Sequence, residues 1–262
     1  MMDIQFEKFH GAGNDFIIID EMDVQHEWSK ALIEKLCARQ TGIGADGFIL
    51  IQPHRNADFK MVYFNSDGNE STMCGNGGRC AAVWFYLNKK NNKALTFEAV
   101  DGEHLAEIFS ESSAKISMNV KSDIRFVDDG IFIDTGSPHL VKEVQNLNVL
   151  NVKLEGSKIR NSDAYKTEGI NINFVSLIND GLQMRTYERG VEAETLSCGT
   201  GTVAVAMAHA IGKHFTDGNY SLPIQAPGGN LKVHFQLHKK QFNYVWLEGP
   251  VVKVFKGEFE RD

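Results

Sequence analysis

Residues 73–77 read Met-Cys-Gly-Asn-Gly, and residues 197–201 read Ser-Cys-Gly-Thr-Gly. The cysteine and both glycines recur at the same places in each stretch, and the cysteines, at positions 74 and 198, are 124 positions apart. An apolar segment of helical length follows each stretch. A single match of this kind arises easily by chance, so its meaning depends on whether the flanking sequence also repeats.

Three further pairs of segments recur in the same order along the chain. They are residues 13–18 with 136–141, residues 59–65 with 182–188, and residues 97–102 with 224–229, at offsets of 123, 123 and 127. A nearly constant offset is typical of an internal duplication. The sequence therefore predicts two homologous halves, each with the order strand, strand, Cys-Gly-x-Gly turn, helix, strand. The boundary is expected near residues 121–130, with Cys74 in residues 1–120 and Cys198 in residues 121–252.

Apolar periodicity predicts the secondary structure of both halves. Helices are expected over residues 27–39, 76–90 and 200–211, and strands over residues 59–64, 104–109, 115–120, 182–187, 231–237 and 244–254. The third helix is apolar nearly all round, which is typical of a buried central helix. The predicted fold is α+β: two pseudo-symmetric homologous domains, each a curled, mainly antiparallel sheet around a central helix headed by a cysteine, with an active-site cleft between them.

Composition excludes several classes of protein. Of 262 residues, 42% are hydrophobic and 23% charged, as in globular domains rather than in disordered or coiled-coil chains. Acidic residues outnumber basic ones by 34 to 27 without a basic cluster, so nucleic acid is not an expected partner. The N-terminus carries acidic residues where a signal peptide carries basic ones, and no apolar run approaches the ~20 residues of a membrane span. A cytoplasmic protein that binds no membrane is expected.

The four cysteines, at positions 37, 74, 80 and 198, include no Cys-x-x-Cys pair. This spacing argues against a disulfide scaffold and against a structural zinc site, so no metal is expected. Thiols in a reducing compartment are the natural interpretation. Cys37 and Cys80 have no counterpart in the other half of the chain, and both are expected in the hydrophobic core.

Cys74 and Cys198 precede predicted helices, where unpaired backbone N–H groups and the positive end of the helix dipole gather. This placement lowers the pKa of a thiol and favours the reactive thiolate. The glycines let the backbone approach an anion closely, so each turn offers a base beside a site for a carboxylate. If the halves face each other, one thiol removes a proton from a carbon and the other returns a proton to the opposite face. Such stereoinversion requires no cofactor, and no P-loop or nucleotide fingerprint is present.

Six motifs carry a resemblance to a known family: His-Gly-Ala-Gly-Asn-Asp-Phe at 10–16, Phe-Asn-Ser-Asp-Gly at 64–68, Cys-Gly-Asn-Gly-Gly-Arg-Cys at 74–80, Pro-His at 138–139, Tyr-Glu-Arg-Gly at 187–190 and Cys-Gly-Thr-Gly at 198–201. Over essentially the whole chain they resemble the diaminopimelate epimerases, a family of the pyridoxal-independent two-cysteine racemases and epimerases. The resemblance implies a cofactor-independent isomerase that interconverts LL- and meso-2,6-diaminopimelate in lysine and peptidoglycan synthesis. It also implies a homodimer, and a C-terminal strand, residues 253–262, that returns to the first domain.

The same resemblance implies roles for individual residues. Cys74 and Cys198 are similar to the two acid/base thiols, and His139 and Glu188 to the residues that tune the pKa of those thiols. The residues implied to bind substrate are Asn14, Asn65, Gly75, Asn76, Asn171, Glu188, Arg189, Gly199 and Thr200. Asn65, just before Ser-Asp-Gly, equally fits ordinary turn chemistry.

Three departures from the family pattern affect the end of the substrate remote from the reacting carbon. Gly47 replaces a glutamine, Ser137 replaces an asparagine, and the loop of residues 190–195 is one residue longer than the common form. Contacts to this distal end are therefore expected to differ in detail.

Two other functions remain open on sequence grounds. A racemase of another amino acid, such as proline or hydroxyproline, would use the same two thiols, although Glu188, Arg189 and the asparagines favour a substrate with a second zwitterionic end. Alternatively, Cys74 and Cys198 form a redox-sensitive disulfide in a protein without catalytic activity.

Overall fold

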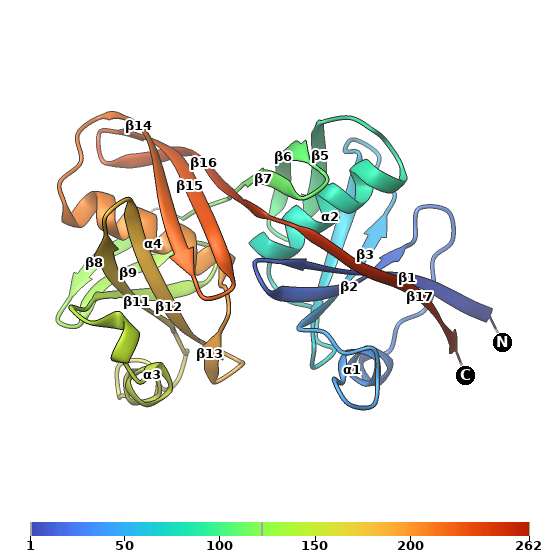
Figure 1. The fold of residues 1–262 in the computed structure, drawn as a ribbon, viewed down its shortest axis with the longest axis horizontal. Coiled ribbons are helices and arrows are strands. Elements are labelled where there is room, and N and C mark those ends of the chain that lie inside the picture. The colour runs from blue at the N-terminus through green and yellow to red at the C-terminus, as the bar shows by residue number, and fades with distance from the viewer. Residues whose placement is uncertain (1, 122, 262) are drawn as a thin grey trace. The chain divides into compact units, whose positions relative to one another are not determined.

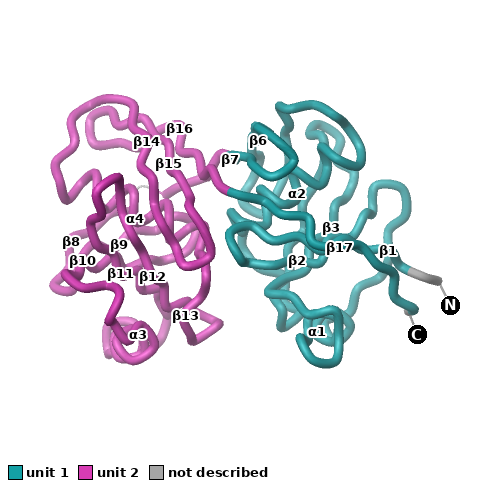
Figure 2. Tube along the Cα trace, in the orientation of Figure 1, with its two compact units in different colours: residues 1–116, 250–262 teal, residues 117–249 magenta. Residues whose placement is uncertain are grey.

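The structure, a computed structural model, describes residues 2–121 and 123–261 and divides into two compact units (Figure 2). Unit 1 comprises the chain up to Ile116 together with the segment from Pro250 onward, and unit 2 comprises Ser117–Gly249. The predicted domain ranges also include Met1, Ser122 and Asp262, which lie outside the described residues.

Unit 1 is a curled sheet that surrounds a helix (Figure 1). Its strands are β1 (Met2–Gly11), β2 (Asn14–Asp20), β3 (Gly47–Gln52), β4 (Phe59–Asn65), β5 (Ala94–Ala99), β6 (Gly102–Ser110), β7 (Ser113–Ser117) and β17 (Val252–Arg261), and its helices are α1 (Lys30–Cys37) and α2 (Gly75–Asn88). Across the sheet the order is β17, β1, β2, β3, β4, β5, β6, β7.

Unit 2 has the same architecture with one added short strand and one added helix. Its strands are β8 (Ile124–Val127), β9 (Gly130–Asp134), β10 (Pro138–Glu143), β11 (Asn171–Ile178), β12 (Gly181–Glu188), β13 (Ala193–Thr195), β14 (Gly218–Ala226), β15 (Gly229–His238) and β16 (Gln241–Pro250), and its helices are the 3₁₀ turn Leu147–Val149, α3 (Val152–Arg160) and α4 (Gly199–Gly212). The order across the sheet is β8, β9, β10, β11, β12, β14, β15, β16, with β13 also beside β12.

The two sheets repeat each other strand by strand. Taken in the orders above, neighbouring strands pair antiparallel, antiparallel, parallel, antiparallel, parallel, antiparallel and antiparallel in both units. The register repeats as well, because Phe59 pairs with Phe97 in unit 1 and Leu182 pairs with Ile224 in unit 2. The duplication and the α+β class predicted from the sequence are confirmed.

The helices that follow the two cysteines are the central helices of their units. Every residue from Gly75 to Phe85 of α2 is buried, and α4 is buried along most of its length. Because α2 contacts β1, β2, β3, β4 and β6, the curled sheet surrounds it. An apolar helix can be stable in water only when it is enclosed in this way, which fixes each cysteine at the helix start on the edge of a core.

Three predicted elements were wrong in extent. The strand expected over 115–120 is β7, which begins at Ser113 and ends at Ser117. The expected helix over 27–39 is shorter: α1 begins after Ser29, whose hydroxyl accepts a hydrogen bond from the Leu32 N–H at 3.2 Å and caps the helix. The expected strand over 244–254 is two strands, β16 and β17, which separate at Val251, where the backbone N–H bonds to Ser112 instead of to the sheet ladder. The chain thereby leaves unit 2 and places β17 beside β1.

None of the helices in the described part of the chain has the length and apolar character that crossing a membrane demands.

Candidate active site

Cys74 is the N-cap residue of α2, and its side chain lies beside Asn14, which is hydrogen-bonded to Asn76. The tight turn at Ala12 and Gly13, both with positive φ, starts β2 at Asn14. The Asn14 Oδ1 lies 3.6 Å from the Cys74 Sγ and accepts a hydrogen bond from the Asn76 Nδ2 at 3.2 Å. The backbone of β1 passes close to this turn, because a Cβ at Gly11 would lie 3.0 Å from the Asn76 carbonyl oxygen, a tight contact.

The orientation of Asn14 is set by a charged cluster behind it. Its Nδ2 donates to the Asp46 Oδ2 at 2.9 Å, which turns its oxygen towards Cys74. Asp46 is paired with Arg39 at 2.6 Å, and Arg39 also bonds Asp15 at 2.8 Å. Burial alone would raise the pKa of Asp15, but its hydrogen bonds to Arg39 and Lys8 and their positive charges outweigh burial and lower the pKa to about 2. Asp15 is therefore ionised at neutral pH.

Cys198 is the N-cap residue of α4 and is served by a directed chain of hydrogen bonds. The Thr186 hydroxyl donates to the Asn173 Oδ1 at 2.9 Å, so the Asn173 Nδ2 is the group that faces the His139 Nδ1, at 3.1 Å. The His139 Nε2 must then carry the proton, and it lies 3.0 Å from the Thr200 Oγ1. Because the Thr200 Oγ1 accepts this hydrogen bond, its own hydroxyl hydrogen can be donated to the Cys198 Sγ, 3.6 Å away.

The imidazole of His139 is completely buried, and this burial, together with the positive charge of Arg189, lowers its pKa to about 3. The ring is therefore neutral at physiological pH, as the hydrogen-bond chain requires. Since the folded pKa lies below the unfolded value near 6.5, this group stabilises the fold fully above pH 6.5, and that stabilisation is lost progressively as the pH falls towards 3.

We expect the His139 ring to remain neutral between pH 8 and about pH 5. The measurement is the NMR shift of its Cε1–H proton against pH, with the unfolded chain in urea supplying a reference titration near pH 6.5. The expected result is a flat curve for the folded protein over this interval. A midpoint between pH 5.5 and 7 in the folded state would contradict both the burial and the proton order of the chain.

A second cluster in unit 2 joins two of the predicted substrate-binding positions, Asn171 and Arg189, and a third, Glu188, adjoins it in sequence. The Asn171 Oδ1 accepts the backbone N–H of Arg189 at 2.9 Å, and its Nδ2 donates to the Ser137 Oγ at 2.9 Å. The Arg189 guanidinium is exposed and bonds the Glu168 carbonyl oxygen at 3.1 Å. Glu188 accepts the Thr195 hydroxyl at 2.8 Å. Ser137, one of the departures from the family pattern, is thus an integral partner of Asn171.

Asn65 has a different local role from the residues of these clusters. Its backbone carbonyl accepts the Gly68 N–H at 2.9 Å, and its side chain is exposed at the end of β4. The turn alone explains an asparagine here, so a contact with substrate stays a prediction.

Sequence reasoning missed the residues that support the site from behind. They are Arg79, Thr135, Asn173 and Thr186, all buried, and the half-exposed Asp46. One signal was available: Asn171 and Asn173 are two residues apart in an apolar strand, so both side chains lie on the same face of β11. No comparable local signal marks Thr186 or Asp46.

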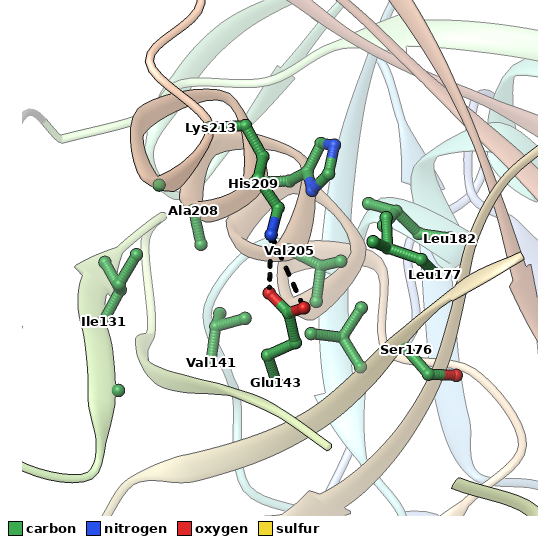
Figure 3. A pocket seen from close by; sticks show the side chains of 13 residues that line it. Ile131, Val141, Glu143, Ser176, Leu177, Leu182, Val205, Ala208, His209 and Lys213 are labelled. Carbon is green, nitrogen blue, oxygen red and sulfur yellow. Dashed lines mark hydrogen bonds and ion pairs between the residues drawn. The ribbon is translucent and has the colours of Figure 1, made fainter. Parts of the chain in front are cut away.

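A separate cavity of about 150 Å³ lies in unit 2, beside the C-terminal part of α4 (Figure 3). Val141, Leu182 and Val205 line it, and the ion pair of Lys213 with Glu143, at 3.2 Å, lies at its side. None of the predicted site residues lines this cavity. In the described residues there is also no group of three His, Cys, Asp or Glu side chains arranged to hold a metal ion.

Comparison with known proteins gives a consistent match. The model of the family described as diaminopimelate epimerase matches residues 6–123 and again residues 131–254. A protein from Flavobacterium psychrophilum named diaminopimelate epimerase is 47% identical over 253 residues, covering 95% of this chain and 97% of that protein. One of the same name from Chlorobaculum tepidum is 42% identical over 260 residues, covering 94% and 98%.

Solved structures share the fold at low sequence identity. A phenazine biosynthesis protein of the PhzF family from Bacillus anthracis superimposes with a TM-score of 0.78 at 16% identity, covering all of both chains. A probable proline racemase from Agrobacterium radiobacter gives a TM-score of 0.71 at 14% identity, covering 99% of this chain and 93% of that one. At this level of identity the likeness concerns the architecture of the two repeated units and not the substrate.

Proposed function

The chain belongs to the diaminopimelate epimerase family, and from this premise we propose that it interconverts LL- and meso-2,6-diaminopimelate with two thiols as the acid and the base. It is accordingly an isomerase, and its product serves the synthesis of lysine and of peptidoglycan. The observation that carries the two-thiol proposal is that Cys74 and Cys198 are N-cap residues with the same extended backbone, at the starts of equivalent buried helices.

The proposed reaction moves one proton at a single α-carbon. A thiolate takes the α-proton from one face and becomes a thiol, while the electron pair left on carbon spreads onto the neighbouring carboxylate. The other thiol then gives its proton to the opposite face and becomes a thiolate. Atoms and charge balance, and the two cysteines end the turnover with exchanged protonation states. The proposal requires both sulfur atoms to serve opposite faces of the same carbon.

The difficult step is the accumulation of negative charge on the carboxylate. In each unit the first helical turn after the cysteine, at Gly75 and Asn76 and at Gly199 and Thr200, presents its backbone N–H groups at the positive end of the helix dipole. We assign these N–H groups to the carboxylate of the reacting centre. Preorganised donors of this kind are worth ~3–4 kcal/mol each in a transition state.

The remaining polar groups are proposed to recognise the rest of the substrate. The exposed Arg189 guanidinium presents a planar fork that suits the distal carboxylate. Asn171 holds the backbone of Arg189 at 2.9 Å, which fixes where that side chain starts. Glu188, Asn14 and Asn65 supply oxygen atoms for the ammonium groups, while His139 and Glu188 adjust the pKa values of the thiols. We also propose, on the family resemblance, that the protein acts in the cytoplasm as a homodimer.

The direct test incubates the purified, reduced protein with LL-diaminopimelate in D₂O. We expect formation of the meso isomer with deuterium at the α-position of the inverted centre and without an added cofactor. The same assay is run on L-proline and trans-4-hydroxy-L-proline, for which no turnover is expected. Inversion of either imino acid in place of diaminopimelate would overturn the substrate assignment. Reversible disulfide formation without any turnover would instead favour a redox switch.

A further inference from the structure

Arg79 lies inside α2 with none of its side chain exposed to solvent. Its Nη2 donates to the Asn76 Oδ1 at 2.7 Å and its Nη1 to the Gly75 carbonyl oxygen at 3.3 Å. The Nε is buried without a hydrogen-bond partner. In the part of the chain that the structure describes, no carboxylate pairs with this guanidinium. Burying an unpaired cation is costly, so its retention calls for an anionic partner that forms during function.

Arg79 is held by the start of its own helix. A Cβ at position 11 of β1 would lie 3.4 Å from the Arg79 Nη2, so β1 passes close to the guanidinium. Both of its hydrogen bonds are to residues of the turn that follows Cys74. The arginine is therefore anchored behind the proposed anion site of unit 1.

The equivalent position of α4 carries no charge. Arg79 is five positions after Cys74, and the residue five positions after Cys198 is Val203, which is also fully buried. Unit 2 has the His139 and Thr200 relay instead, which directs a hydroxyl donor at the Cys198 Sγ. In unit 1 the group that faces the sulfur is a hydrogen-bond acceptor and not a donor, because the Asn14 Oδ1 faces the Cys74 Sγ. A carbonyl oxygen disfavours a thiolate, so unit 1 needs another source of stabilisation.

The charged residues beside Asn14 balance each other, and the second cysteine of α2 is uncharged. Lys8 and Arg39 pair with Asp15 and Asp46, two cations against two anions. On α2 itself, burial raises the pKa of the Cys80 thiol far above its usual range, so this neighbour stays uncharged. On β1, the ring of His10 accepts the Gly13 backbone N–H through its Nδ1. Among the described residues, no carboxylate balances the charge of Arg79 at this helix start.

Burial lowers the pKa of Arg79 to about 10, and negative charge on Cys80 or Cys74 acts in the opposite direction. The guanidinium therefore remains protonated at neutral pH, where Cys80 is a neutral thiol. Cys74, the N-cap residue of α2, carries a negative charge when it is ionised, and that charge favours the protonated guanidinium.

Building on the proposed function, we propose that Arg79 is the positioning residue that stabilises Cys74 as a thiolate, the role that the His139 and Thr200 pair fills for Cys198. The two halves of the duplicated fold thus meet the same chemical need by different means, a buried cation in one and a polarised hydroxyl in the other. Both thiols can then ionise in turn, as a reversible two-base reaction demands.

The test measures the alkylation of each cysteine by iodoacetamide against pH, with the modified peptides quantified by mass spectrometry. Arg79→Gln removes the charge and keeps an N–H donor for Asn76. We expect its Cys74 midpoint to rise by at least one pH unit, so that alkylation at a pH well below the original midpoint slows by about tenfold or more, since only the thiolate reacts. Cys198 in the same sample is the internal control and is expected to keep its profile. Arg79→Lys, which retains a charge, is expected to restore most of the original midpoint.

An unchanged Cys74 midpoint in Arg79→Gln, or an equal shift at both cysteines, would overturn the proposal. If that variant does not fold by circular dichroism, the unmodified protein decides: its Cys74 midpoint must lie below the ~8.5 of an ordinary thiol. A value at or above 8.5 contradicts the inference. Because alkylation needs no substrate, this outcome is independent of the epimerase assay, and either proposal can fail while the other stands.

Discussion

Replacement of Cys198 by alanine is expected to lower the rate of conversion of LL- to meso-diaminopimelate by about 10²- to 10⁴-fold, the usual contribution of a positioned acid or base. The Thr200 hydroxyl, 3.6 Å from the sulfur, is too weak an acid to replace the thiol. Cys74→Ala is expected to have an effect of the same size. The measurement is kcat for both directions of the reaction, with circular dichroism to confirm that each variant is folded.

Cys37→Ala is the matched control for these variants. Cys37 is a buried thiol of α1, and burial raises its pKa to about 12, so it is a neutral core residue at all working pH values. Its loss is expected to leave kcat within about twofold. Each catalytic variant retains a base for only one face of the α-carbon. It is therefore expected to incorporate deuterium slowly, with retention of configuration, into only one of the two isomers. Cys74→Ala and Cys198→Ala are expected to act on opposite isomers. Unreduced epimerisation by either variant would refute the two-thiol mechanism.

The architecture was predictable because the repeated segments occur in the same order in both halves of the chain, so that both halves fold with the same topology. Matched segments such as 59–65 and 182–188 become strands that pair in the same register with the next matched segment, at Phe97 and Ile224. Local apolar periodicity located α2 and α4 to within a few residues, since a helix that is apolar all round has only one place in a small domain.

The elements that the sequence pattern misplaced depend on contacts with distant residues. Trp28 has the spacing of an α1 face residue, but it precedes the helix, where its ring lies 4.7 Å from that of Phe48 and its Nε1 donates to Glu21 at 2.7 Å. Likewise, nothing local in residues 241–261 shows that the chain breaks at Val251. That break follows from the unpaired edge of β1, which β17 completes in the position that β8 has in unit 2.

In the candidate site, too, some features depend on neighbouring residues in the sequence and others on residues that are distant in the sequence. The thiols and the Gly-x-Gly turns are contiguous in sequence, so their chemistry could be inferred from residue type and position. The orientation of the supporting groups could not, because it depends on which atom of each side chain meets which neighbour. Asn173 is an example: Thr186, thirteen positions further along the chain, determines that its Nδ2 faces His139.

Gly201→Ala is expected to damage stability and activity together. A Cβ at this position of α4 would lie 2.5 Å from the Asn173 Oδ1 and 3.2 Å from the Cys198 Sγ. Asn173 is fully buried and bonded on both sides, so it cannot move without breaking its contacts with Thr186 or His139. Overpacking of this kind costs about 1–3 kcal/mol. A displaced His139 no longer fixes the Thr200 hydroxyl, so a fall in kcat of at least about tenfold is expected.

Gly212→Ala tests the same exchange in the same helix without the clash. Its Cβ would meet only the Ile131 Cδ1, at 3.5 Å, an ordinary contact, and its backbone is not in the left-handed region. Loss of glycine flexibility there is expected to leave the protein unchanged or more stable by up to ~1 kcal/mol. Melting temperatures and kcat of the two variants, measured side by side, separate crowding at Cys198 from a general intolerance of α4 to alanine. If Gly201→Ala matches the unmodified protein in both quantities, the Asn173 to Thr200 chain does not hold Cys198 in the way described.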